Sequence, residues 1–390
     1  MRMIRPRPQT TRARWVLLAA LLAASLLWGC APAPSGSGDS PSISEKPSSS
    51  PVGTTASIRI HATGIPNPTD VDELPDGSLL VGARDGRLFR VAGDGTVGMI
   101  GDLSEKVFSG GERGLLGIAL SPPAAQSEER ALYATYNRKG DGATVLVSAR
   151  LKLQPFGIFG VSDPLLVIDH YNSNHNGGDI VVLRDGTLIV STGDSGGSGD
   201  PFNAAQNLKS NLGKLLLIDV RGSVPAVRTI ARGLRNPWKI ALDPNESTLW
   251  IADVGQESHE EVNRFPLEVI ADQGSRLVNF GWPILEGDAC FRSTPCTPPD
   301  DYLAPVWTYR HGPSCSIIGG TVTRGEYLYS DFCDAKIFAL PLDAASGTPP
   351  TLLLPLGEKR QPSAIFSTKD GRVWVLDIDR GEVLEILLAD

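Results

Sequence analysis

The sequence predicts an all-β protein, a six-bladed β-propeller that follows a signal peptide and a disordered linker. Three observations lead to this prediction. No long helical pattern occurs between Ser57 and Asp390, short apolar runs end in Asp-Gly, Asn-Gly or Gly-Gly turns, and similar units recur along the chain. Gly (42) and Pro (30) are both plentiful, which suits a fold made of many short strands and turns.

The recurring unit consists of an apolar strand, a polar turn and a second apolar strand. It occurs around Asp85-Gly86 and again in residues 180–190, 240–253 and 364–377. Residues 57–390 have room for six to eight blades of ~40–50 residues each, and the long inserted loops favour six. The last strand, residues 382–388, is expected to close the ring beside the first, which would leave only short, protected sheet edges. A pair of β-sandwiches is the alternative, which the repeat period disfavours.

Residues 1–30 have the pattern of a lipoprotein signal peptide. Five arginines precede an apolar run from Trp15 to Trp28, which is short for a permanent membrane span. The run ends in Leu27-Trp28-Gly29-Cys30, which resembles a lipobox, so Cys30 is expected to carry lipid and to anchor the chain to a membrane. An uncut anchor and a plain secretory signal are the alternatives.

Residues 31–56 are rich in Ser, Pro and Gly and nearly lack large apolar side chains. Such a segment cannot bury enough surface to offset its ordering entropy, so we expect a flexible linker that holds the folded domain, residues 57–390, outside the membrane. The expected location is the cell envelope. The formal net charge is −8 and no basic stripe follows the N-terminus, which argues against nucleic acid as a partner.

Four cysteines lie in the folded region, and an even number in an exported chain indicates disulfides. Of the three possible pairings we favour Cys290–Cys296, which closes a short loop, together with Cys315–Cys333, which would join two neighbouring strands. A zinc site is the alternative, but the spacings lack a C-x-x-C motif.

Two polar segments in the middle of the chain contain candidate catalytic groups. In residues 172–179, His175 is followed closely by two glycines that leave room for a ligand, and an imidazole suits the role of general base for a hydroxyl proton. Asp194 follows the next strand and could orient His175 or a ligand. The alternatives are a turn histidine that bonds only backbone and an Asx turn at Asp194.

Two further segments suggest anion and cation binding. Arg235 and Asn236 enter another blade, and the guanidinium could hold an anionic or quinone oxygen through charge-assisted hydrogen bonds. Residues 252–263 combine a glycine turn with several carboxylates, which suits a hard cation such as calcium. A surface arginine beside a structural Asn-Pro turn and a solvated acidic turn are the respective alternatives.

Together, these segments and their order resemble the soluble glucose / aldose sugar dehydrogenase family, which uses the quinone cofactor PQQ. The similarity covers nearly all of residues 58–390 and is carried by the runs 112–120, 175–178, 192–194, 213–216, 235–237, 255–263 and 279–283. Residues 314–320 and 331–333 look like the branch that includes hedgehog-interacting-protein-like propellers. The resemblance implies a six-bladed propeller with PQQ flat on its upper face.

The resemblance also implies a role for individual residues. His175 matches the family's base, Arg235 the residue that polarises the quinone carbonyl, and Asp194 an acidic residue of the site. The implied cofactor contacts are Glu112, Asn236, Arg324 and Lys336. The carbonyl groups of Gly255 and Gln256 match the positions that hold the calcium bound to PQQ, although Gln256 stands where proline is common.

The function that the resemblance implies is oxidation of an aldose sugar at its anomeric carbon to the lactone, with hydride transfer to PQQ in the presence of calcium. The partners would be the sugar and an electron acceptor. A non-catalytic propeller that binds a glycan or a protein is the first alternative. A calcium-dependent hydrolase is the second, and it would need a nucleophile or paired carboxylates that the sequence does not reveal.

Overall fold

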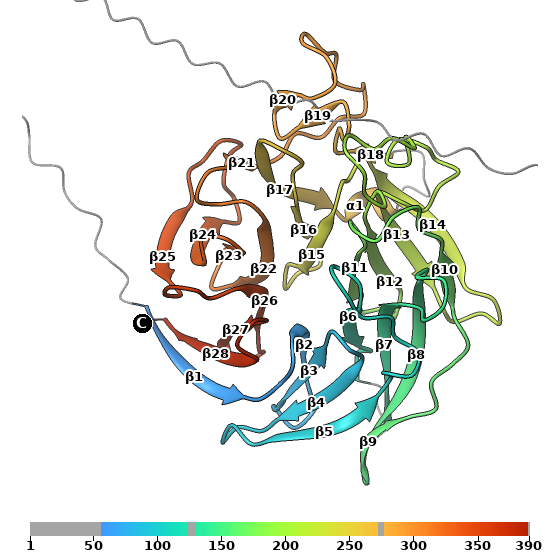
Figure 1. Ribbon diagram of the computed structural model, residues 1–390, viewed down its shortest axis with the longest axis vertical. Coiled ribbons are helices and arrows are strands. Elements are labelled where there is room, and N and C mark those ends of the chain that lie inside the picture. Colours follow the sequence, from blue (N-terminus) through green and yellow to red (C-terminus); the bar gives the residue numbers. More distant parts are fainter. Residues whose placement is uncertain (1–55, 124–128, 272–276, 389–390) are drawn as a thin grey trace, which may run out of the picture. The chain divides into compact units, whose positions relative to one another are not determined.

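The computed structural model describes residues 56–123, 129–271 and 277–388. Within these residues, six sheets of four or five strands surround a common centre, so the prediction of an all-β six-bladed propeller is confirmed (Figure 1). Their one helix, α1 (Glu268–Ala271), is a single turn, and no helix among them has the length and apolar character needed to cross a membrane. The predicted signal peptide with Cys30 and almost all of the predicted linker lie outside the described residues.

Each blade is an antiparallel sheet whose first strand lies innermost. In sheet order, the first blade contains β2 (Pro68–Glu73), β3 (Leu79–Ala83), β4 (Arg87–Val91) and β5 (Val97–Asp102). The second blade contains β6 (Leu115–Leu120), β7 (Glu129–Asn137), β8 (Thr144–Leu153) and β10 (Leu166–Ile168), and β9 (Phe156–Phe159) also pairs with β8. The third blade contains β11 (Gly177–Val182), β12 (Leu188–Thr192), β13 (Lys214–Asp219) and β14 (Ala226–Arg232), to which β18 (Val278–Asn279) adds in parallel.

The fourth blade contains β15 (Pro237–Leu242), β16 (Thr248–Asp253), β17 (His259–Pro266) and β21 (Trp307–Arg310). The fifth blade contains β22 (Ile317–Thr323), β23 (Glu326–Asp331), β24 (Lys336–Pro341) and β25 (Thr351–Pro355). The sixth blade contains β26 (Pro362–Ser367), β27 (Val373–Asp377), β28 (Glu382–Leu387) and β1 (Ser57–Thr63). A separate hairpin, β19 (Leu285–Glu286) and β20 (Ala289–Cys290), extends from the fourth blade.

The ring closes through strands from opposite ends of the folded region. β1 pairs antiparallel with β28, from Ser57 opposite Leu387 to Thr63 opposite Glu382. The innermost strands also contact one another all the way round, from β2 through β6, β11, β15, β22 and β26 back to β2. The expected closure is therefore confirmed, and the alternative of two sandwiches is excluded.

The Asp-Gly pairs form the tight turns that the repeat predicts. At Asp85-Gly86 the carboxylate accepts the amide of Arg87 at 3.1 Å, and Gly86 has φ +97°. The same turn recurs at Asp185-Gly186, where the carboxylate accepts the amide of Thr187 at 2.9 Å. An Asx turn followed by a left-handed glycine joins antiparallel strands with little strain, which explains why the motif marks the hairpins.

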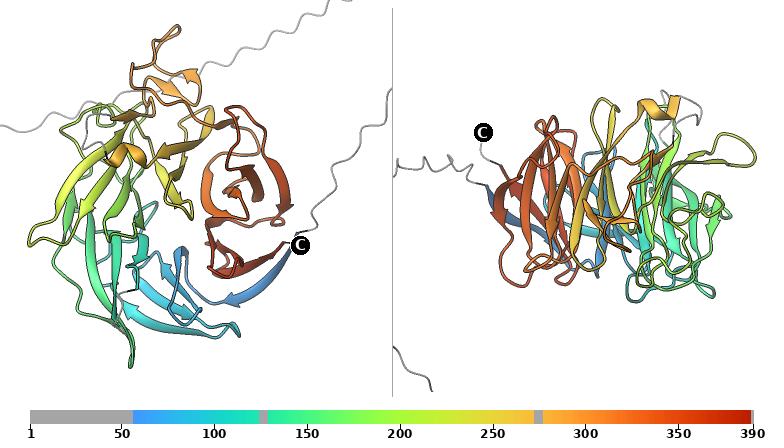
Figure 2. Two further views of the ribbon diagram at one scale, coloured as in Figure 1. Left: turned by 180° about the vertical axis from the view of Figure 1, so that it is seen from behind. Right: turned by 90° about the horizontal axis from the view of Figure 1, so that it is seen from above.

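The apolar core lies between neighbouring blades rather than in one central cluster. Side chains on both faces of the middle strands are buried against the next blade, as for Trp250, which stacks on Tyr327 at 4.8 Å between the fourth and fifth blades. Seen from the side in Figure 2, the connecting loops lie on two opposite faces of the ring. We call the face at which the first strand of each blade begins the upper face.

Both predicted disulfides are present. Cys290–Cys296 closes the loop beyond β20, and Cys315–Cys333 joins the segments before β22 and after β23. The zinc alternative is excluded because all four sulfur atoms are used in these bonds.

Candidate active site

A cavity of about 370 Å³ opens on the upper face. Its wall is built from the starts of first strands and from the turns that follow second strands, so all six blades contribute. The lining includes Thr69, Arg84, Glu112, His175, Arg235, Asn236, Gly255, Ser316, Phe332, Ser363 and Ile378. The structure therefore brings together the candidates that the sequence placed far apart, from Glu112 to Gly255.

His175 lies at the centre of a hydrogen-bonded row of three side chains. Its Nδ1 is 2.7 Å from Oδ1 of Asp194, and its Nε2 is 2.9 Å from Nη2 of Arg235. A guanidinium can only donate hydrogen bonds, so Nε2 must be the acceptor and the ring proton must reside on Nδ1, where it is donated to Asp194. This is the neutral tautomer of a general base, with its lone pair directed at a group in the cavity wall.

Asp194 is fully buried, and both of its carboxylate oxygens accept hydrogen bonds besides the one from His175. Its Oδ1 also accepts the amide of Gly196 at 2.7 Å, and its Oδ2 accepts the indole N–H of Trp282 at 2.8 Å. Trp282 thus holds the oxygen of Asp194 that does not bond His175. The carboxylate is in position to stabilise positive charge on His175 when the ring takes a proton.

The backbone around His175 is held in an uncommon conformation. His175 has φ +52°, and a side chain at Gly193 would place its Cβ 2.0 Å from the carbonyl oxygen of His175. Non-glycine residues rarely adopt positive φ, and such conformations persist where surrounding contacts impose them. The glycine in the sequence Thr192-Gly193-Asp194 therefore allows the close approach that brings Asp194 to His175.

Arg235 is 7% exposed and is held by three groups. Its Nη1 donates to the carbonyl of Val254 at 2.7 Å, its Nη2 donates to Oε1 of Gln256 at 3.2 Å, and the guanidinium lies 5.6 Å from the ring centroid of Trp282. Gln256, which departs from the usual proline, therefore has a role through its side chain. The arrangement directs a fixed positive charge into the cavity beside the base.

Asp253 fixes the start of the strand that carries Arg235. Its carboxylate accepts the amides of Arg235 at 2.9 Å and Asn236 at 2.7 Å. Burial raises the pKa of Asp253 to about 7, although these amides and the Arg235 guanidinium favour the charged form. Asn236 in turn accepts the amide of Gly177 at 3.2 Å, which connects the third and fourth blades beneath the cavity.

Glu112 is an exposed residue at the mouth of the cavity. Its Oε2 accepts the backbone amide of His175 at 2.7 Å, so it supports the base. The resemblance had implied a cofactor contact for this residue, and its place in the lining is compatible with that role.

The loop after β16 offers oxygen atoms for a cation. Gly255 lines the cavity, and the carbonyl oxygens of Gly255 and Gln256 accept no hydrogen bond from any residue in the described ranges. Unused carbonyl oxygens are ligands that calcium prefers, so this donor set fits a hard cation. The cavity also has the cations Arg84 and Arg235 for carboxylate groups and flat apolar walls at Trp238 and Phe332, which fit a planar, anionic quinone.

Two residues that the resemblance placed at the cofactor lie elsewhere. Arg324 is in the exposed turn between β22 and β23, at the end of a seven-residue first strand and so roughly 20 Å from the upper face. Lys336 begins β24 but does not line the cavity, and its ammonium group pairs with Asp334 at 2.8 Å. The turn of Arg324 lies on the lower face, so the structure does not bring this residue to the cavity with the other candidates. Lys336 is not among the residues that line the cavity, so its implied cofactor contact stays a prediction.

Sequence reasoning missed two residues of the site. Arg84 follows β3 and lines the cavity, but in the sequence it stands at the start of an Asp-Gly turn and looks like a turn residue. Trp282 lies in a motif that the resemblance included, without a role. Buried tryptophans need a partner for the indole N–H, so a tryptophan in a glycine-rich loop is the signal that could have identified it.

Comparison with known proteins identifies a family and a shared fold. The family model Glucose / Sorbosone dehydrogenase matches residues 65–336. A PQQ-bound aldose sugar dehydrogenase from Streptomyces coelicolor has the same fold, with a TM-score of 0.70, 25% identity and coverage of 86% of this chain and 99% of that one. A putative glucose dehydrogenase from Thermus thermophilus shares the fold at 24% identity, with a TM-score of 0.69 and coverage of 85% and 100%.

Sequence relatives are more varied. The HIPL1 protein of Arabidopsis thaliana is 30% identical over 218 residues, and the chain spans about a third of the length of the plant relatives it matches. The aldose sugar dehydrogenase YliI of Escherichia coli is 25% identical over 254 residues, which are 59% of this chain and 62% of that protein. Because the family model matches well over half of the chain, the chain belongs to the glucose / sorbosone dehydrogenase family.

Proposed function

We propose that this protein oxidises an aldose sugar at its anomeric carbon to the lactone, with PQQ and calcium bound in the upper cavity. The observation that carries the proposal is the row Asp194–His175–Arg235, which presents a neutral imidazole and a guanidinium to the same space. PQQ, when bound, supplies the acceptor for the hydride that leaves the sugar. The rest of the chemistry requires a base and a positive charge, which the chain supplies.

His175 would take the proton of the anomeric hydroxyl at Nε2. In the structure this atom accepts from Arg235, so binding must first draw the guanidinium to another acceptor, such as a quinone oxygen. Asp194 then stabilises the protonated ring, while Arg235 stabilises negative charge that develops on the oxygen it holds. The pairing of His175 with Arg235 therefore occupies Nε2 until the site is filled.

The residues around this row would hold the two bound groups. Arg84 and Arg235 offer donors to carboxylates, and the carbonyls of Gly255 and Gln256 would hold calcium. The lipid anchor at Cys30 would keep the domain at the cell envelope, where an electron acceptor must reoxidise the enzyme. We therefore propose the cell envelope as the location, and an aldose sugar and an electron acceptor as the two partners.

Reconstitution tests this proposal directly. The purified apo-protein is mixed with PQQ and calcium chloride, the absorption spectrum is followed, and turnover is assayed with a dye acceptor over a panel of aldoses. We expect a spectral change on binding and dye reduction that depends on both PQQ and calcium. If PQQ produces no spectral change, the enzyme proposal fails, and the alternative of a propeller that binds a glycan or a protein is favoured.

A further inference from the structure

The loop of residues 255–259, between β16 and β17, directs a run of consecutive backbone amides at one carboxylate. Oε1 of Glu286 accepts the amides of Gln256 at 2.8 Å, Glu257 at 2.7 Å, Ser258 at 2.8 Å and His259 at 3.2 Å. Its Oε2 accepts the hydroxyl of Ser258 at 2.8 Å. Glu286 is 3% exposed and lies on β19, outside the blade that carries the loop, so one buried side chain determines the path of the whole loop.

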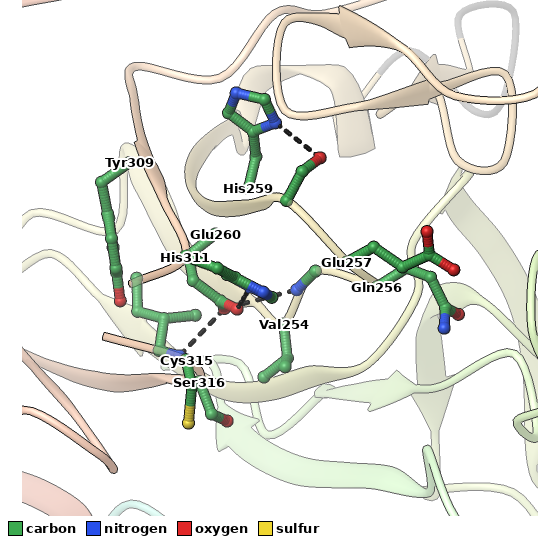
Figure 3. Close-up of polar contacts among 12 residues, drawn as sticks. Val254, Gln256, Glu257, His259, Glu260, Tyr309, His311, Cys315 and Ser316 are labelled. Carbon is green, nitrogen blue, oxygen red and sulfur yellow. Dashed lines mark hydrogen bonds and ion pairs between the residues drawn. The ribbon is translucent and has the colours of Figure 1, made fainter. Parts of the chain in front are cut away.

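A second buried carboxylate holds the first amide of the same loop. Oε2 of Glu260 accepts the amides of Gly255 at 3.3 Å and Ile317 at 2.9 Å, and its Oε1 lies 2.5 Å from Nε2 of His311. Figure 3 shows the Glu260 carboxylate between the loop and the segment that carries Cys315 and Ser316. Every amide from residue 255 to residue 259 therefore donates to a carboxylate.

The direction of the amides determines the direction of the carbonyls. In a trans peptide the N–H and C=O groups point to opposite sides, so amides gathered on Glu286 turn the preceding carbonyls away from it. The carbonyls at the two ends of the run have partners, since that of Val254 accepts from Arg235 and that of Ser258 accepts the amide of His311. Between them, the carbonyl oxygens of Gly255, Gln256 and Glu257 have no hydrogen-bond partner within the described ranges, and of these three residues Gly255 lines the cavity.

Charge and packing also favour a loop whose carbonyl oxygens can bind a cation. A carboxylate that accepts an amide proton increases the negative charge on the carbonyl of the same peptide group, because hydrogen bonds in series polarise one another. A side chain at Gly255 would place its Cβ 1.7 Å from the carbonyl oxygen of His259, so the tight loop requires glycine there.

We propose that Glu286 is a positioning residue for a cation: its carboxylate gathers four amides of the loop, which presents the carbonyl oxygens of Gly255, at the cavity wall, and of Gln256, next to it in the loop, as preformed ligands. This inference rests on the proposed function for the identity of the cation, calcium. It adds a residue that does not line the cavity and that lies on the β19–β20 hairpin, next to the loop closed by Cys290–Cys296. The hairpin would thereby be coupled to the affinity of the site.

Calcium titration of three variants tests the inference without turnover. The full-length chain is freed of divalent ions with a chelator and titrated with calcium chloride in a calorimeter, with and without PQQ. Glu286→Gln keeps an oxygen acceptor for the amides but removes the charge, and Glu286→Ala removes both. Asp243→Asn is the matched control, because Asp243 accepts the amides of Ser247 at 2.6 Å and Thr248 at 3.1 Å in a turn at the opposite end of the same blade.

We expect the calcium dissociation constant to rise about tenfold in Glu286→Gln and up to about a hundredfold in Glu286→Ala, which is the range for residues that orient metal ligands. Asp243→Asn should bind calcium as the wild type does. Thermal melting in the absence of calcium identifies loss of fold, and Glu286→Gln should melt near the wild-type temperature.

Wild-type calcium affinity in both Glu286 variants would overturn the inference, and so would a wild-type protein that binds no calcium. If the variants lose calcium affinity as expected but the wild type reduces no dye with any sugar, the proposed function fails and the role of Glu286 stands. The two results are therefore separable.

Discussion

His175 shows how much chemistry depends on the partners of a single side chain. An exposed histidine exchanges freely between tautomers, whereas His175 is held between a buried acceptor, Asp194, and an obligate donor, Arg235. The lone pair at Nε2 is therefore available at the cavity whenever Arg235 moves away. The role of Asp194 is equally specific, because Trp282 and Gly196 occupy the rest of its acceptor capacity.

Replacement of the base should separate binding from catalysis. We expect His175→Ala to lower dye-linked turnover by about 10²–10⁴-fold, the usual contribution of a general base, while PQQ binding followed by absorption stays close to wild type. Asp194→Asn should also lower turnover, because the charge that stabilises protonated His175 is lost. His61→Ala is the control, since His61 lies on β1 and bonds the carbonyl of Ala92. Wild-type turnover in His175→Ala would refute the assignment of the base.

At the scale of an element, the long connection between β12 and β13 forms part of the upper face. It carries Asp194 at its start, and its far end is held by Lys214, whose ammonium donates to the carbonyls of Ala204 at 2.8 Å, Ala205 at 2.9 Å and Leu212 at 2.6 Å. Lys214 is fully buried, and burial lowers its pKa to about 7. Lys214 therefore supports the architecture of this loop through its hydrogen bonds to three carbonyls.

This lysine should make stability depend on pH. Its pKa is about 7 in the folded state and 10.5 in the unfolded state, so the unfolded state binds more protons between these values and stability rises with pH. We expect the unfolding free energy of the wild type, relative to Lys214→Met, to rise by up to about 1.4 kcal/mol per pH unit in this window. Urea unfolding at pH 7.5 and 9.5 measures the slope. The exposed Lys209→Met is the control, and an equal slope in wild type and Lys214→Met would contradict the prediction.

At the scale of the whole molecule, one buried lysine joins four blades below the cavity. Lys239 on β15 lies 2.7 Å from a carboxylate oxygen of Asp70 on β2 and 3.0 Å from one of Asp179 on β11. Asp70 also accepts the amide of Ile118 on β6 at 2.6 Å. Burial opposes the charge of Lys239, but the two carboxylates more than offset it, and the pKa lies above its ordinary value.

Removal of this lysine should weaken the ring as a unit. Lys239→Met leaves two buried carboxylates without their cation, and we expect a loss of about 3–5 kcal/mol in the free energy of unfolding measured with urea. Adding Asp70→Asn and Asp179→Asn should recover most of the loss. Arg372→Gln, which breaks an exposed pair with Asp370, should cost less than about 1 kcal/mol. A loss for Lys239→Met no larger than this control would show that the cluster does not hold the ring.

The blade count and both disulfides could be predicted because each depends on local patterns, and the closure of the ring follows from the blade count. An Asp-Gly pair indicates a hairpin at its own position in the sequence. The disulfide pairing follows from the even number of cysteines and from strands that are neighbours in the repeat. His175, Asp194, Arg235 and Gly255 were also found from the sequence, since each follows or precedes a strand at the same end of its blade. Arg324 shows the limit of matching by position, because a shift of one strand length moves a residue to the opposite face.

The sequence by itself determined that the chain forms a propeller, because alternation and turn residues act within about a dozen positions. It also predicts which residues would carry acid–base chemistry. Only the tertiary structure decided the tautomer of His175, the entry of Arg84 into the cavity and the hold of Glu286 on a distant loop. These depend on how blades far apart in the chain face each other, which is set by packing across the ring rather than by any local pattern.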